Sequence, residues 1–228
     1  MSLTIGMLLF PKLTQLDLTG PYEVLARAPD SRIHLVWKDR SPIASDRGMG
    51  MVPDMSFADC PQLDLICVPG GPGHVALMED DETLDFLRTQ AAKARWVTSV
   101  CTGSLVLGAA GLLDGYRATS HWGSRERLSA FGAIPTDKRV VIDRNRITGG
   151  GVTSGIDFAL TVIAELYGED TARRIQLQIE YDPAPPFTGG SPQSAAPELV
   201  EAVLAGSTAY YALRDSAIER ASAKLKKH

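Results

Sequence analysis

Short apolar segments alternate with longer helical patterns along most of the chain. In the segment Leu63–Val68, apolar and polar residues do not alternate as they do in a half-exposed strand. A lack of alternation is typical of strands that are buried on both faces of a parallel sheet. Strands that alternate with helices indicate an α/β fold with a doubly wound, mostly parallel sheet and helices on both faces. The predicted strands are Leu3–Phe10, Ile33–Trp37, Leu63–Val68, Trp96–Val100, Arg117–Thr119, Arg139–Ile142 and Arg146–Thr148. The predicted helices are Gly20–Ala28, Glu82–Lys93, Gly103–Leu113, Ser124–Ala130, Ile156–Tyr167, Thr171–Glu180 and Pro197–Lys226.

A stretch rich in proline and glycine, residues 181–193, interrupts this pattern near the C-terminus. These residue types oppose regular structure, so we expect a main domain over residues 1–180, a connector over 181–193 and a helical extension over 194–228. The extension reads as one helix, which cannot form a core alone. We therefore expect it either to pack back on the domain or to join a partner subunit. Gly48 and Gly50 predict a small edge hairpin within Ile43–Met55.

Composition narrows the class of protein. The chain has 228 residues, of which 44% are hydrophobic and 22% charged, and a formal net charge of −4. This charge argues against nucleic acid as the main partner, because phosphate binding needs clustered Lys and Arg. No apolar run is long enough to span a membrane, and the N-terminus does not resemble a signal peptide. Three cysteines without CxxC spacing favour a reducing cytoplasm.

Cys101 is the strongest candidate for a catalytic side chain. It ends the predicted strand Trp96–Val100, and a helix begins within about two residues. A thiol there should lie near helix N–H groups, which favour the thiolate, and the Thr102 N–H could face a developing negative charge. A buried structural cysteine is the alternative on spacing alone, and Cys60 and Cys67 fit that alternative better.

Two glycine-rich turns follow other predicted strands and should face the same cleft. In the first turn, Pro72 and the glycine spacing do not fit a dinucleotide-binding fingerprint. Gly70, Gly71 and Gly73 are instead candidates for a pocket whose N–H groups stabilise an anion beside Cys101. A plain tight turn is the alternative. In the second turn, Gly150 and Val152 are candidate pocket residues, although tight backbone packing would equally require glycines there.

Asp17 is the candidate acid or base. It follows the first predicted strand and is flanked by Leu16 and Leu18, so partial desolvation should raise its pKa. Helix capping ahead of Pro21 is the alternative role, and Glu23 is the competing carboxylate. His121 ends a short strand and could approach Cys101. The histidines show no ligand spacing that suggests a metal site.

These motifs together resemble the ThiJ/PfpI superfamily, which is related to class I glutamine amidotransferases and has a flavodoxin-like fold. The resemblance covers nearly the whole chain up to about Glu180, and the segment 177–187 extends it into the tail. Its strongest segments are Gln15–Pro21, Val68–Gly71, Ser99–Ser104 and Gly149–Asp157. Within the superfamily the chain is most similar to the isocyanide hydratases.

The resemblance implies a homodimeric, cofactor-free enzyme that hydrates isocyanides to N-formamides. By motif position it implies Cys101 as nucleophile, Asp17 as general acid/base and Thr102 as a supporting residue. The thiolate would attack the isocyanide carbon, Asp17 would protonate that carbon, and water would hydrolyse the thioimidate. Members that act as proteases often carry His directly after the nucleophile, where this chain has Thr102.

Three other functions remain open at this point. A glyoxalase or deglycase should depend on His121, and a redox-sensing stress protein needs a reactive Cys but no turnover. The ligand-sensing half of an AraC-type regulator carries similar motifs. That class needs a helix-turn-helix region, whereas we expect a single helix after the break and the net charge is negative.

Overall fold

A seven-stranded sheet forms the centre of the computed structural model, which describes residues 3–226. Its strand order is β10-β11-β7-β6-β1-β2-β5, and every neighbouring pair is parallel except β10 and β11. The strands are β1 (Leu3–Leu8), β2 (Ser31–Trp37), β5 (Met55–Ser56), β6 (Leu65–Val68), β7 (Trp96–Val100), β10 (Val140–Asp143) and β11 (Arg146–Gly149). The order β2-β1-β6-β7-β11 is the flavodoxin-like arrangement, so the predicted fold class is confirmed.

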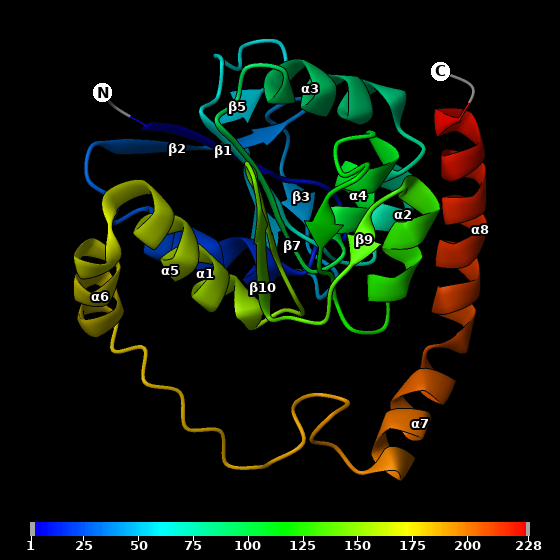
Figure 1. Cartoon of the computed structure of the whole chain (residues 1–228). Helices are drawn as coiled ribbons and strands as arrows, with labels where there is room; N and C mark the ends of the chain where they lie inside the picture. Colours follow the sequence, from blue (N-terminus) through cyan, green and yellow to red (C-terminus); the bar gives the residue numbers. More distant parts are fainter. Residues whose placement is uncertain (1–2, 227–228) are drawn as a thin grey trace.

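Helices cover both faces of the sheet. Helices α1 (Gln15–Leu25), α5 (Ser154–Tyr167) and α6 (Glu169–Gln178) lie on one side, with α1 packed on α5 (Figure 1). The other side carries α2 (His74–Leu77), α3 (Asp81–Ala91), α4 (Gly103–Ala109) and a 3-10 helix, η1 (Arg125–Phe131). With both faces covered, all four residues of β6 are buried, as the apolar pattern predicts.

Two small sheets lie outside the central one. Strands β3 (Ile43–Ala44) and β4 (Gly50–Met51) form the hairpin predicted around Gly48 and Gly50, but they pair only with each other. Strand β8 (Arg117–Ala118) pairs with β9 (Ile134–Pro135) rather than joining the main sheet. A short apolar pattern in the sequence does not show which sheet a strand will join.

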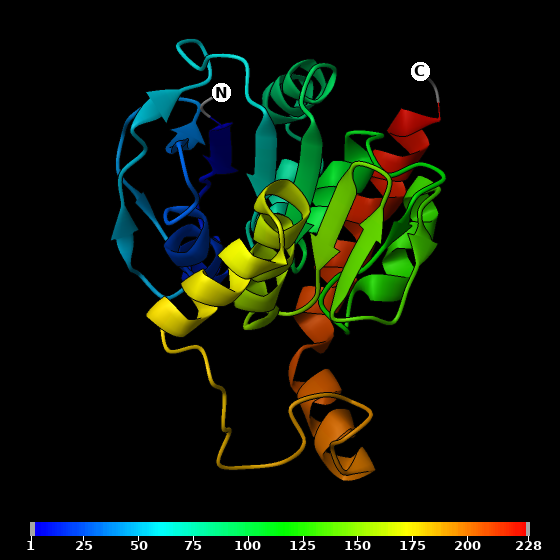
Figure 2. The same ribbon diagram turned by 60° about the vertical axis from the view of Figure 1, so that its left-hand side comes forward.

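Two helices follow the connector where the sequence predicts one. Residues 179–196 are irregular, α7 spans Pro197–Gly206, and α8 spans Thr208–Leu225. The break falls at Ser207, next to Gly206, a residue of low helix propensity. Helix α8 packs back against α2, α4 and η1, whereas α7 has no buried residue and projects from the body (Figure 2). No helix within residues 3–226 is long and apolar enough to cross a membrane.

The parallel strands place four turns at one edge of the sheet. Asp17 follows β1, Gly70 follows β6, Cys101 follows β7 and Gly150 follows β11. Ligands of open α/β sheets bind beyond the carboxyl ends of the strands. Helix α1 begins at Gln15 rather than at Gly20 as predicted, and Asp17 therefore lies within its first turn.

Candidate active site

Cys101 lies on a strained turn between β7 and α4. Its φ of 56° is in the left-handed region, which few residues other than glycine adopt. The Cys101 N–H donates to the carbonyls of Gly149 and Gly150 at 3.0 and 2.8 Å. Its carbonyl accepts hydrogen bonds from the hydroxyls of Ser104 and Ser120, both at 3.0 Å. These four hydrogen bonds hold Cys101 in a left-handed backbone conformation that is unfavourable for a non-glycine residue in an unfolded chain.

Asp17 is fully buried and contacts the Cys101 side chain. Oδ2 of Asp17 accepts the Gly70 N–H at 3.1 Å, and Oδ1 has no N–H or O–H donor among residues 3–226. Burial raises the Asp17 pKa to about 7, against the opposing effects of hydrogen bonds from Cys101 and Gly70. A carboxyl group with this pKa can both donate and accept a proton near neutral pH. Desolvation is the effect predicted from Leu16 and Leu18, and Asp17 does not cap its helix.

The Cys101 thiol differs from expectation. We expect the helix N-terminus to favour the thiolate, but burial and the Asp17 carboxylate raise the thiol pKa well above its ordinary value. Hydrogen bonds from the Thr102 N–H and hydroxyl oppose that rise without cancelling it. A short helix end therefore does not compensate for the loss of water around the sulfur. The thiol can ionise readily only if a nearby base takes its proton, and Asp17 is in contact with it.

The loop after β6 supports these side chains through its N–H groups. The Gly71 N–H donates to Thr102 Oγ1 at 3.0 Å, and the Gly73 N–H to the Lys12 carbonyl at 3.1 Å. Together with the bond from Gly70 to Asp17, all three N–H groups have acceptors within the protein. The sequence suggests instead that these groups face an anion. In the structure the N–H groups of Gly70 and Gly71 position Asp17 and Thr102, and that of Gly73 holds the loop to Lys12.

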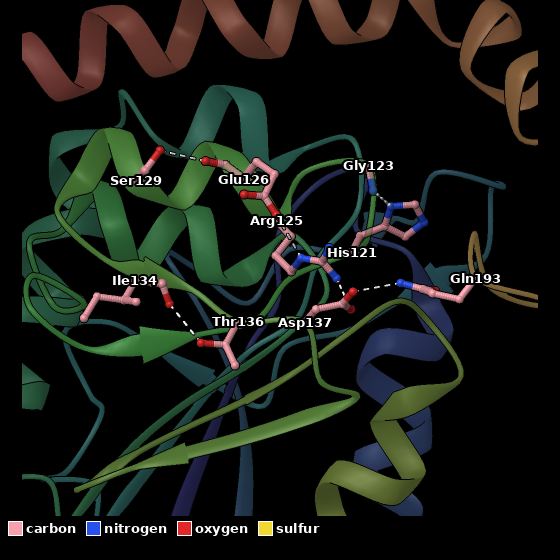
Figure 3. Close-up of polar contacts among 9 residues, drawn as sticks. All are labelled: His121, Gly123, Arg125, Glu126, Ser129, Ile134, Thr136, Asp137 and Gln193. Atoms are coloured by element: carbon pink, nitrogen blue, oxygen red, sulfur yellow. Dashed lines mark hydrogen bonds and ion pairs between the residues drawn. The ribbon is translucent and has the colours of Figure 1, made fainter.

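Gly150, Val152 and His121 line a cavity of about 430 Å³, and Cys101, Asp17 and Thr102 are not among its lining residues within the described chain. Gly150 and Ser120, two lining residues, hydrogen-bond the Cys101 backbone directly. His121 Nδ1 accepts the Gly123 N–H at 3.2 Å (Figure 3). Burial and the Arg214 guanidinium lower the His121 pKa, so its imidazole is neutral at pH 7.

The connector closes one side of this cavity through Ser191, Pro192 and Gln193. Gln193 Nε2 donates to Asp137 Oδ2 at 2.8 Å, and the other carboxylate oxygen of Asp137 pairs with Arg125 (Figure 3). The irregular segment is therefore tied to the body of the protein at its C-terminal end.

Several residues at the site carry no sequence signal that could have identified them. Ser104 and Ser120 bond the Cys101 carbonyl, and the buried His74 and Arg214 lie with the half-buried Tyr210 next to the glycine loop. Tyr210 and Arg214 belong to the extension, which only the tertiary structure brings to the site. Among the described residues, no group of three or more His, Cys, Asp or Glu side chains is arranged to hold a metal ion.

Comparison with known proteins identifies the family of the chain. A model of the DJ-1/PfpI family matches residues 4–165. The chain is 59% identical to the isonitrile hydratase of Pseudomonas putida over 225 residues, covering 99% of both chains. It is 32% identical to the HTH-type transcriptional regulator GbdR of Pseudomonas aeruginosa, covering 78% of this chain but only 51% of the regulator.

A crystal structure of a ThiJ/PfpI family protein from Pseudomonas syringae superimposes with a TM-score of 0.93 at 44% identity, covering 96% of this chain and 91% of that one. Drosophila melanogaster DJ-1beta superimposes with a TM-score of 0.72 at 25% identity, covering 79% of this chain and 98% of its own. The family match, the full-length relative and the shared fold lead to one conclusion: the chain belongs to the DJ-1/PfpI family.

Proposed function

We propose that the protein is an isocyanide hydratase, which converts isocyanides to N-formamides through a thioimidate on Cys101 with Asp17 as general acid/base. The observation that carries the proposal is the contact between the Cys101 thiol and a buried carboxyl group whose pKa is about 7. The full-length similarity to the isonitrile hydratase of Pseudomonas putida supports the substrate class.

The first step transfers the thiol proton to Asp17 while the sulfur attacks the isocyanide carbon. The Thr102 hydroxyl and N–H stabilise the thiolate as it forms. The carbon becomes basic once sulfur adds, and Asp17 returns the proton to it. The net change adds S–H across the terminal carbon and gives Cys101–S–CH=N–R.

The second step hydrolyses this thioimidate. Asp17, again a carboxylate, accepts a proton from water as the oxygen attacks the thioimidate carbon. The C–S bond then breaks, the sulfur leaves with a proton, and the imidate nitrogen gains a proton to give the N-formamide. The atoms balance as one isocyanide and one water per formamide, so the reaction needs no cofactor.

The cavity of about 430 Å³ is the site proposed for the isocyanide substituent. Gly150, Val152 and His121 line it, and its wall is bonded to Cys101 through Gly150 and Ser120. Gly70 and Gly71 complete the proposed site by holding Asp17 and Thr102, and Gly73 anchors the same loop to the Lys12 carbonyl.

The direct test supplies an aryl isocyanide to the wild type and to the Cys101→Ala and Asp17→Asn variants, with formamide formation followed over time. We expect turnover by the wild type only. No turnover by the wild type contradicts the hydratase proposal, and full activity of Asp17→Asn removes that residue from proton transfer. Methylglyoxal consumption that is lost in His121→Ala would instead favour a glyoxalase.

We further propose a cytoplasmic homodimer. Helix α7 presents Leu199, Val203 and Leu204 to solvent and has no buried residue, which suits a subunit contact. All three cysteines are free, as a reducing compartment requires. Light scattering on the purified chain should give twice the mass of one chain; a monomer at micromolar concentration contradicts the dimer.

A further inference from the structure

A buried imidazole lies directly behind the glycine loop of the site. His74 is fully buried, and its Nδ1 lies 2.8 Å from the Gly71 carbonyl, which can only accept a hydrogen bond. The network therefore assigns the proton to Nδ1 and leaves Nε2 as an acceptor. Nε2 is buried and has no partner among residues 3–226. Burial lowers the His74 pKa to about 4, so the ring is neutral and Nε2 keeps its lone pair at pH 7.

Tyr210 of helix α8 packs against this imidazole. The two ring centroids are 6.2 Å apart and the ring planes meet at 73°, an edge-to-face contact. Within the described chain, no group hydrogen-bonds the Tyr210 hydroxyl. Burial, and then the charge of a Cys101 thiolate, raise the Tyr210 pKa to about 12, so the phenol stays protonated near neutral pH.

Arg214, one turn further along α8, fixes this helix in place. Its side chain is buried and donates to the Gly123 carbonyl at 2.6 Å and to Ser124 Oγ at 2.9 Å. It also pairs with Asp215 at 2.7 Å. Tyr210 is therefore held on a packed helix rather than on a loose tail.

We infer that Tyr210 and His74 are positioning residues that hold the hydrolytic water for the second step of the proposed reaction. An unpaired donor and an unpaired acceptor on adjacent, fixed side chains match the needs of one water molecule. The Tyr210 hydroxyl donates to the water oxygen, and a water hydrogen bonds His74 Nε2. The inference rests on the proposed function, because only hydrolysis of the thioimidate requires a water.

The residues act in this step without exchanging protons. The second water hydrogen points to Asp17, which accepts it as the oxygen attacks the carbon of Cys101–S–CH=N–R. The C–S bond breaks and the products are N-formamide and the free thiol, so no oxidant or further reactant is needed. Addition of the thiol in the first step does not involve this water, and the two residues should leave that step unchanged.

The test compares Tyr210→Phe and His74→Asn with the wild type on an aryl isocyanide. Phe keeps the ring contact, and Asn keeps an N–H donor near the Nδ1 position while removing the Nε2 acceptor. Tyr211→Phe is the matched control, since it removes a neighbouring phenol of the same helix. Thermal unfolding of each variant verifies that it is folded.

We expect kcat and KM to fall together by about tenfold or more in both variants, with kcat/KM unchanged, because only the later step is slowed. Intact-mass spectrometry during turnover should then show Cys101 carrying the added mass of one isocyanide. Equal losses in kcat and kcat/KM without this adduct, or unchanged kinetics, overturn the inference while the hydratase activity stands. A wild type that forms neither adduct nor formamide overturns both.

Discussion

Gly70 and Asp17 are matched so closely that a single added methyl group would separate them. The Gly70 N–H donates to Asp17 Oδ2 at 3.1 Å, and a Cβ on Gly70 would lie 2.8 Å from that oxygen and 2.6 Å from the Thr102 backbone nitrogen. The backbone of one turn therefore approaches two side chains of the proposed mechanism at once. This approach explains why the position requires glycine although its φ is not in the left-handed region.

Gly70→Ala should lower kcat by about tenfold or more, because the Cβ would displace both the Asp17 carboxyl and the Thr102 turn. Gly206→Ala is the control, since a Cβ there would have no neighbour within 4 Å in the described part of the chain. Steady-state kinetics on an aryl isocyanide gives the comparison. Equal kcat for the two variants would show that the site tolerates the shift.

Asp17 should make the protein less stable as the pH rises. Its folded pKa of about 7 lies above its ordinary value of 3.8, so the folded state binds the proton more tightly between these values. The stabilisation is fully present below pH 3.8 and is lost as the pH rises through 7, about 4 kcal/mol in all. Urea denaturation at pH 5 and pH 8 should show the wild type losing stability relative to Asp17→Asn. A constant difference between the two proteins would contradict the raised pKa.

Thr102→Val should slow alkylation of Cys101 at every pH below the thiol pKa. Valine removes the hydroxyl that bonds the sulfur, and the Cys101 pKa should rise further. The rate of carboxamidomethylation by iodoacetamide, measured against pH, reports the thiolate fraction. Thr102→Ser keeps the hydroxyl and should restore most of the rate; no recovery would mean that the methyl group matters instead.

Arg214→Ala should destabilise the protein by about 3 kcal/mol, because the Gly123 carbonyl and the Ser124 hydroxyl would lose a charged donor inside the protein. Arg220→Ala, on the same helix, removes an exposed ion pair with Glu79 and should cost much less stability. Urea denaturation compares them. Similar losses in both variants would show that α8 is not anchored through Arg214.

Asp137→Ala should weaken binding of bulky isocyanides more than that of small ones. The variant releases Gln193 and Arg125, and the connector wall of the cavity should loosen. We expect KM for a bulky aryl isocyanide to rise by about two- to tenfold, with KM for methyl isocyanide nearly unchanged. The same KM increase for both substrates would argue that the wall does not contact the substituent.

Much of the fold and the core of the candidate site can be read from the sequence, because both depend on local patterns. Apolar segments without polar alternation, such as the one that ends at Val68, indicate central strands. Glycines or other small residues directly after these strands indicate turns at one edge of the sheet. Asp17 and Cys101 follow two such strands, so their proximity follows from the parallel topology. The direction of the Asp17 pKa shift is expected from its apolar neighbours in the chain, and burial in the folded protein produces it.

What the sequence leaves undecided depends on long-range packing. A local dipole argument favours a Cys101 thiolate, but the sum of burial and the Asp17 charge reverses it, and both act through space. The acceptors of the Gly70 and Gly71 N–H groups belong to distant segments, so the role of these two groups as supports for Asp17 and Thr102 appears only in the folded chain. The sequence alone determined that Cys101 follows a buried strand and lies near an acid. Tertiary packing of α8 decided that Tyr210 contacts His74 next to the glycine loop. Such contacts join segments more than 100 residues apart, and they leave no periodic pattern in the sequence.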